Sequence, residues 1–65
     1  MVRHIQLKTL RIRRHLSQKQ LAEATGVTRA YVGMVEQGKR TPRLAVAGQM
    51  ARTLGVSIEE LFGGD

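Results

Sequence analysis

The sequence of 65 residues contains no cysteine and no tryptophan, and it has only one proline, one tyrosine and one phenylalanine. Without cysteine, the chain can form neither a disulfide nor a thiolate metal site. The two histidines, His4 and His15, each follow an arginine, which makes them a poor ligand set for a cation. We therefore expect no bound metal and no cofactor.

Long apolar runs are missing as well. No stretch approaches the ~18 apolar residues of a membrane span, and the first residues lack the apolar segment of a signal peptide. We expect a cytoplasmic protein without a membrane partner. So short a chain predicts one domain, residues 1–65, with residues 1–4 as a basic arm and residues 63–65 as a tail. Domains below roughly 70 residues that lack a disulfide or metal often need a partner chain, which favours a homodimer.

Acidic residues are few and unevenly placed. Eleven Lys and Arg face five Asp and Glu, so the formal net charge is +6. Residues 1–16 carry five cations and no acid, residues 17–56 carry six cations and two acids, and residues 57–65 carry only three acids. This gradient favours a polyanionic partner, although arginine-rich helices can also serve solubility alone. The acids show no paired-carboxylate spacing, so we predict that the protein is not an enzyme.

Hydrophobic periodicity predicts an all-α protein of five short helices, with no strand pattern. The expected ranges are residues 5–14, 17–25, 28–37, 43 or 44 to 54, and 57 to 61 or 62. On the first helix the apolar face holds Leu7 and Leu10 and, less regularly, Ile5 and Ile12. The fourth helix is expected to bury Leu44, Ala47, Met50, Ala51 and Leu54. His15 stands where a left-handed residue closes the first helix, so we interpret it as structural rather than as a proton-transfer group.

The second and third helices are separated by a very short turn. Ser17 begins the pattern Ser-x-x-Gln, a capping box with Gln20 that starts a helix, and Gly26 stands where a left-handed residue ends it. Thr28 offers the N-cap of the next helix two residues later. The two helices must cross steeply, which predicts a helix-turn-helix whose second helix presents its first amides at the surface. This geometry suits the major groove of DNA.

Three separated motifs carry a resemblance to a known family. In chain order they are LSQKQLAEATGVT, VEQGKRTP and LGVSIEELF. Over residues 5–62 the chain resembles the Cro/CI-type, Xre-like helix-turn-helix domain of phage repressors and bacterial transcriptional regulators. The resemblance implies a compact five-helix bundle of the lambda-repressor-like type. It also implies that the protein binds operator DNA as a homodimer, with the third helix in the major groove.

The resemblance further implies roles for individual positions. The residues at the base-facing positions of the third helix are Arg29, Ala30, Tyr31 and Met34. The residues expected to contact phosphates are Gln18, Lys19, Thr28, Gln37, Lys39, Arg40 and Arg43. Arg11 and Glu36 match the family's buried ion pair between the first helix and the end of the third. The residues expected at the dimer interface are Val56, Leu61 and Phe62.

Side-chain chemistry supports parts of this assignment and leaves alternatives open. The planar fork of Arg29 fits the O6 and N7 atoms of guanine, but a residue at a helix start can also bind a phosphate without reading sequence. Ala30 can accept a thymine methyl group. Met34 can do the same or pack in the core, and Tyr31 can lie on the sugar-phosphate edge or pack on the second helix. Gly33 costs ~1 kcal/mol of helix propensity relative to alanine, and it either allows close approach to DNA or is a neutral surface residue.

We therefore predict a sequence-specific, double-stranded DNA-binding transcriptional regulator, namely a repressor that reads the major groove with residues 28–37. The alternative is an antitoxin or adaptor whose helix-turn-helix scaffold mainly binds a protein partner. The basic surface favours DNA, whereas a partner-binding role predicts that the apolar residues of the last helix contact another protein.

Overall fold

Five α-helices follow one another in the computed structural model, which describes residues 5–62. They are α1 (Ile5–Arg13), α2 (Gln18–Thr25), α3 (Arg29–Glu36), α4 (Leu44–Leu54) and α5 (Ile58–Phe62). The predicted all-α class is confirmed, because residues 5–62 contain no strand and each helix begins and ends within one residue of its expected bounds. The expected basic arm, residues 1–4, and the tail, residues 63–65, lie outside the described residues.

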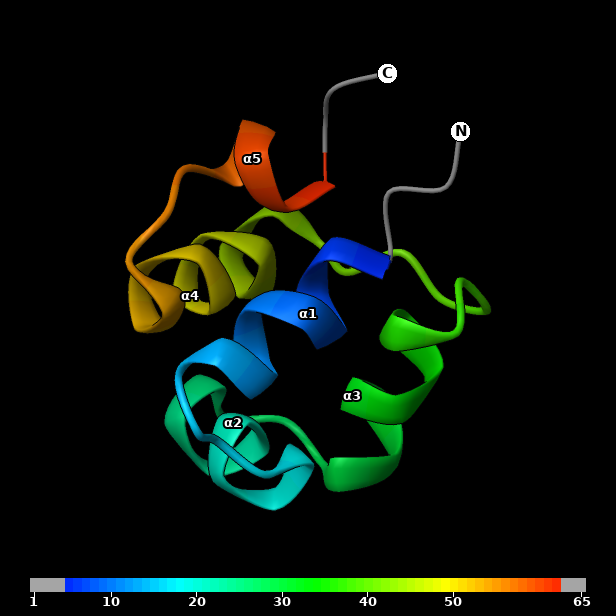
Figure 1. The fold of residues 1–65 in the computed structure, drawn as a ribbon. Helices are drawn as coiled ribbons and strands as arrows, with labels where there is room; N and C mark the ends of the chain where they lie inside the picture. The colour runs from blue at the N-terminus through cyan, green and yellow to red at the C-terminus, as the bar shows by residue number, and fades with distance from the viewer. Residues whose placement is uncertain (1–4, 63–65) are drawn as a thin grey trace.

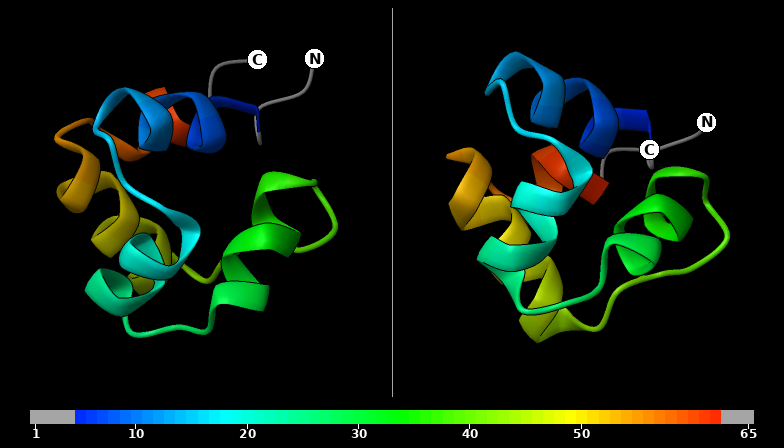
Figure 2. Two further views of the ribbon diagram at one scale, coloured as in Figure 1. Left: turned by 60° about the horizontal axis from the view of Figure 1, so that its bottom comes forward. Right: turned by 90° about the horizontal axis from the view of Figure 1, so that it is seen from below.

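The helices are arranged so that the α2–α3 turn lies far from α5. In Figure 1, α1 runs across the centre of the molecule, with α2 and α3 below it and α4 and α5 towards the upper left. Figure 2 shows α2 and α3 set at an angle to each other and joined by a short turn, whereas a longer segment leads from α3 to α4. Within residues 5–62, no helix has the length and apolar character needed to cross a membrane.

The core of the molecule is almost entirely aliphatic. Its buried members are Leu7, Leu21, Ala22, Val32, Val35, Met50, Ala51, Leu54 and Leu61. They come from all five helices, and the side chains of the single tyrosine and the single phenylalanine only pack against the edge of this cluster. Because every helix contributes to one core, the position of α3 relative to the rest of the molecule is fixed by packing.

Two apolar residues that were assigned to the apolar faces of their helices are exposed. Ile12 is 54% exposed because it lies well to the side of the α1 face that carries Leu7 and Arg11. Leu44 is 75% exposed, so the prediction that it is buried was wrong. It occupies the first turn of α4, and the apolar stripe of that helix becomes covered only from Val46 onward.

The end of α1 is tied to the end of α4 by a contact that the sequence did not predict. The Nε atom of Arg14 donates to the backbone carbonyl oxygen of Leu54 at 2.9 Å. A cation at this point interacts favourably with the negative end of the α4 dipole. It also donates a hydrogen bond to one of the last carbonyl groups of that helix. His15 follows with φ of 59°, which confirms its predicted role as the left-handed residue that ends α1.

Candidate nucleic-acid interface

Local hydrogen bonds hold α2 and α3 in the predicted helix-turn-helix geometry. The amide of Gln20 donates to Ser17 Oγ at 3.0 Å, and the amide of Ser17 donates to Gln20 Oε1 at 2.8 Å, which completes the capping box. Gly26 closes α2 with φ of 74°, a conformation in which a Cβ atom would cause strain. Thr28 Oγ1 then accepts the amide of Tyr31 at 3.0 Å and caps α3. The turn is therefore set by its own sequence.

A buried ion pair anchors the carboxyl end of α3 to α1. Arg11 Nε lies 2.5 Å from Glu36 Oε2, and the two side chains are only 10% and 4% exposed. Arg11 also donates through Nη1 to the carbonyl oxygen of Leu16 at 2.8 Å. The predicted pair is thus present. It satisfies both charges inside the protein, and neither residue is available as a free surface charge.

Gln18 belongs to the same network, which was not expected. Its Nε2 atom donates to Glu36 Oε1 at 2.9 Å, and the residue is half-buried. This bond uses one of the two N–H groups of the amide and leaves its carbonyl oxygen and the second N–H group for another partner. Through Glu36, residues of α1, α2 and α3 are joined at one point, beside the surface on which α3 is exposed.

The outward face of α3 carries three of the four predicted base-reading residues. Arg29, Ala30 and Met34 are exposed, whereas Val32 and Val35 on the opposite face are completely buried. Two residues on this side of the helix are small, namely Ala30 and Gly33, and Gly33 is half-buried. This arrangement leaves Arg29, at the amino end of α3, as its longest polar side chain.

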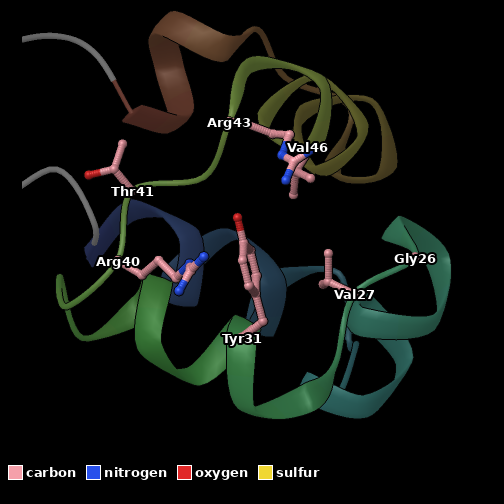
Figure 3. A pocket seen from close by; sticks show the side chains of 7 residues that line it. All are labelled: Gly26, Val27, Tyr31, Arg40, Thr41, Arg43 and Val46. Atoms are coloured by element: carbon pink, nitrogen blue, oxygen red, sulfur yellow. The ribbon is translucent and has the colours of Figure 1, made fainter.

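Tyr31 differs from the other three predicted base-reading residues because its side chain does not lie on the exposed face of α3. The residue is half-buried and packs against the edge of the core. Figure 3 shows its ring standing in a hollow, with the hydroxyl group directed towards Arg43 and Val46 of the opposite wall. The guanidinium carbon of Arg40 lies 5.2 Å from the centre of the ring. The structure therefore groups Tyr31 with the loop that precedes α4.

The remaining candidate phosphate ligands surround α3. The exposed members of this set are Lys19, Thr28, Gln37, Lys39, Arg40 and Arg43. Residues 17–43 contain five exposed cations, counting Arg29, and only two acids, of which Glu36 is neutralised by Arg11. The surface around α3 consequently has a strong excess of positive charge, and Glu23 is its one exposed acid within residues 17–43.

The expected dimer residues do not all reach the surface. Leu61 is 0% exposed in the single chain, so its assignment to a dimer interface was wrong. Its position on α5 places it in the common core, where it supports the fold of one protomer. Val56 and Phe62 remain half-buried and keep part of their surface at this end of the molecule.

Gly33 offers a test of whether the face of α3 approaches another molecule closely. A Cβ atom at this position would lie 3.8 Å from Gln18 Nε2, an ordinary contact that the fold tolerates. We expect Gly33→Ala to raise the free energy of unfolding by ~1 kcal/mol, because alanine favours a helix. If the backbone at this point approaches DNA, the same change weakens DNA binding.

The measurement combines urea unfolding with DNA titration. Gly48→Ala is the matched control, since Gly48 is also inside a helix, and its added Cβ atom would lie 3.9 Å from the side chain of Ile58 in the core-facing region of α4. It should stabilise the protein without weakening DNA binding. Equal DNA affinity for wild type and Gly33→Ala would identify Gly33 as a neutral surface glycine.

Comparison with known proteins places this arrangement among helix-turn-helix domains. A family model described as helix-turn-helix matches residues 7–61. The chain is similar to an HTH-type transcriptional regulator of Mycobacterium tuberculosis, with 46% identity over 48 residues that cover 74% of this chain and 34% of the relative. It thus spans about a third of the length of that protein.

Solved structures show the same fold. The restriction-modification controller protein C.AhdI from Aeromonas hydrophila is 39% identical, with a TM-score of 0.84 over 91% of this chain and 89% of the other. The c2 repressor of phage P22, solved in complex with a synthetic operator, has a TM-score of 0.93 over 100% of this chain and 98% of the other. At 18% identity the second likeness concerns the fold alone. The predicted lambda-repressor-like fold is confirmed.

Proposed function

We propose that this chain, which belongs to the helix-turn-helix family, is a transcriptional regulator that binds double-stranded DNA sequence-specifically and represses transcription from its operator. One observation carries the proposal: one face of α3 is exposed and surrounded by cations, while the opposite face of that helix is buried in the core. A regulator of this kind acts on the chromosome, so the proposal places the protein in the cytoplasm.

The dimensions of α3 support insertion into the major groove. An α-helix with its side chains is roughly 10 to 12 Å across, and the major groove of B-DNA is about 12 Å wide. Small residues at Ala30 and Gly33 allow the helix to lie close to the base edges. In this pose Arg29 reads guanine through a bidentate contact, and Ala30 and Met34 contact thymine methyl groups. Gln18, Lys19, Thr28, Gln37, Lys39, Arg40 and Arg43 contact the backbone and set the register.

Size favours a two-fold dimer on DNA. Successive major-groove sites on one face of DNA are about 34 Å apart, whereas one protomer extends at most 28 Å. Two copies are therefore needed to read two half-sites. We assign the contact between them to the α5 end, where Phe62 and Val56 keep exposed surface.

Phe62→Asp should convert the two-protomer complex into one protomer per DNA molecule, because a carboxylate would have to be buried at the contact. Sedimentation of the complex with selected operator DNA measures this stoichiometry. Circular dichroism establishes that the variant is folded, and Ile12→Asp, at an exposed apolar residue of α1, is the control. If two Phe62→Asp protomers still bind each DNA molecule, the dimer contact does not lie at α5.

The function itself is tested by selecting bound duplexes from a random DNA pool. We expect an enriched palindrome whose half-sites are centred ~10 to 10.5 base pairs apart. A pool that remains random would contradict sequence-specific binding. Repression is then tested by placing the selected operator over a promoter and measuring reporter transcription with and without the protein.

The alternative, an antitoxin or adaptor, relies on apolar surface at α5 for a protein partner. The burial of Leu61 reduces that surface to the half-buried residues Val56, Ile58 and Phe62, which weakens this alternative for the described residues. Pull-down of a stable protein partner, together with a failed DNA selection, would favour it.

A further inference from the structure

Tyr31 belongs to the proposed recognition helix, but its ring contacts Arg40 in the loop that follows that helix. We propose that Tyr31 is a positioning residue, which holds the guanidinium group of Arg40 ready for a phosphate of the DNA backbone. The inference rests on the proposed function and replaces the predicted base-reading role of Tyr31. It links the helix that reads bases to the loop that contacts the backbone.

The distance between the two groups is the first observation. Arg40 Cζ lies 5.2 Å from the centre of the Tyr31 ring, inside the ~6 Å limit for attraction between a cation and an aromatic face. Figure 3 shows the Arg40 side chain extending from the loop towards the ring. The hollow that both residues line also contains Val27, Val46 and Arg43, but no acid.

The second observation is that Tyr31 is held rigidly, whereas Arg40 is not held by helix packing. Tyr31 lies in the first turn of α3, its amide is bound by the capping threonine, and its side chain packs against the core. Arg40 lies between α3 and α4, in a stretch without helical hydrogen bonds, and is exposed. An arginine in such a loop loses conformational freedom when it binds a phosphate, and a preformed contact with Tyr31 reduces that loss.

The kind of contact matters for what Arg40 can still bind. A carboxylate partner would occupy the N–H groups of the guanidinium and cancel its charge. An aromatic face attracts the cation without accepting those N–H groups in its plane, so they stay available for a phosphate. Glu36, an acid that ends the same helix, is already bound by Arg11 and Gln18. The ring can therefore position Arg40 without neutralising it.

The contact is tested first in the absence of DNA. In the NMR spectrum of the free protein, the side-chain protons of Arg40 should show a ring-current shift in wild type and in Tyr31→Phe. That shift should disappear in Tyr31→Leu, which keeps an apolar side chain but removes the ring. Circular dichroism checks that each variant is folded. Identical Arg40 shifts in all three proteins would overturn the proposal before any DNA is added.

The second measurement is a double-mutant cycle on random duplex DNA and on the selected operator over a salt series. We expect Tyr31→Leu to weaken binding about two- to fivefold, the equivalent of the ~0.5 to 1 kcal/mol of an exposed cation–π contact. In an Arg40→Ala background the same change should have no further effect. Tyr31→Phe should rescue binding relative to Tyr31→Leu. Arg52→Ala, which removes an exposed cation from the last turn of α4, is the control for a general loss of charge.

The outcomes separate the two hypotheses. If wild type binds DNA but Tyr31→Leu weakens binding equally with and without Arg40, the positioning role is wrong and the proposed function stands. If Tyr31→Leu changes the preferred base sequence to the same extent with and without Arg40, Tyr31 reads bases and does not position Arg40. If wild type binds no duplex at all, both the proposed function and the DNA role of this contact fail, whereas the NMR result still decides whether the contact exists.

Discussion

Replacing Glu36 with alanine should lower the free energy of unfolding by ~3 to 5 kcal/mol. The change strands the guanidinium group of Arg11, whose side chain is only 10% exposed, and also removes the acceptor for Gln18 Nε2. Small domains have about 5 to 15 kcal/mol of stability in total, so the variant should be close to unfolding at room temperature. Urea unfolding followed by circular dichroism measures the loss.

Two further variants make this result specific. Glu36→Gln keeps an oxygen acceptor but not the charge, so its loss of stability should be smaller than that of Glu36→Ala. Glu23→Ala removes an exposed acid from α2 and should change stability by no more than ~0.5 kcal/mol. Wild-type stability of Glu36→Ala would mean that the ion pair does not hold the fold together.

Arg29→Ala and Arg40→Ala should weaken DNA binding in different ways. Loss of a bidentate contact with guanine costs ~1 to 3 kcal/mol of discrimination, so Arg29→Ala should weaken binding to the selected operator while random DNA is bound almost as before. Each phosphate contact contributes about 0.9 to the slope of log affinity against log salt. Arg40→Ala should therefore weaken all sequences similarly and flatten that slope, twice over in a dimer.

The experiment titrates both variants against the selected operator and a scrambled duplex at several salt concentrations. Lys39→Ala removes a second exposed loop cation and should resemble Arg40→Ala if both contact phosphates. Equal losses on both DNAs for Arg29→Ala would instead identify Arg29 as a phosphate contact. The protein would then discriminate weakly between sequences, because the other exposed residues of α3 offer no comparable hydrogen-bond donor near its start.

Sequence reasoning predicted the fold well where local chemistry decides the structure. The capping residues Ser17 and Thr28 and the left-handed residue Gly26 act through atoms only a few positions away, so their effect can be read from the chain. It failed at Leu44, whose exposure depends on where the neighbouring helices end. Hydrophobic spacing predicts which residues share a face, but it does not reveal how far that face is covered.

Only part of the candidate site was predicted, because some of its contacts are made between residues far apart in the sequence. The resemblance located the pair of Arg11 and Glu36 and the exposed face of α3. It did not reveal that Gln18 joins the pair, because that bond connects residues 18 positions apart through side chains alone. The contact between Tyr31 and Arg40 likewise depends on the path of the loop, which has no periodic pattern to indicate it.

The division of α3 into two faces has a consequence for how such a regulator can change its target. Val32, Val35 and Glu36 hold the helix in place, whereas Ala30 and Met34 are exposed and are not part of the buried core. Under the proposed function, substitutions on the outer face can therefore alter the preferred operator at little expense in folding. Natural divergence and laboratory redesign can both explore new DNA targets there, as long as the inner face is kept.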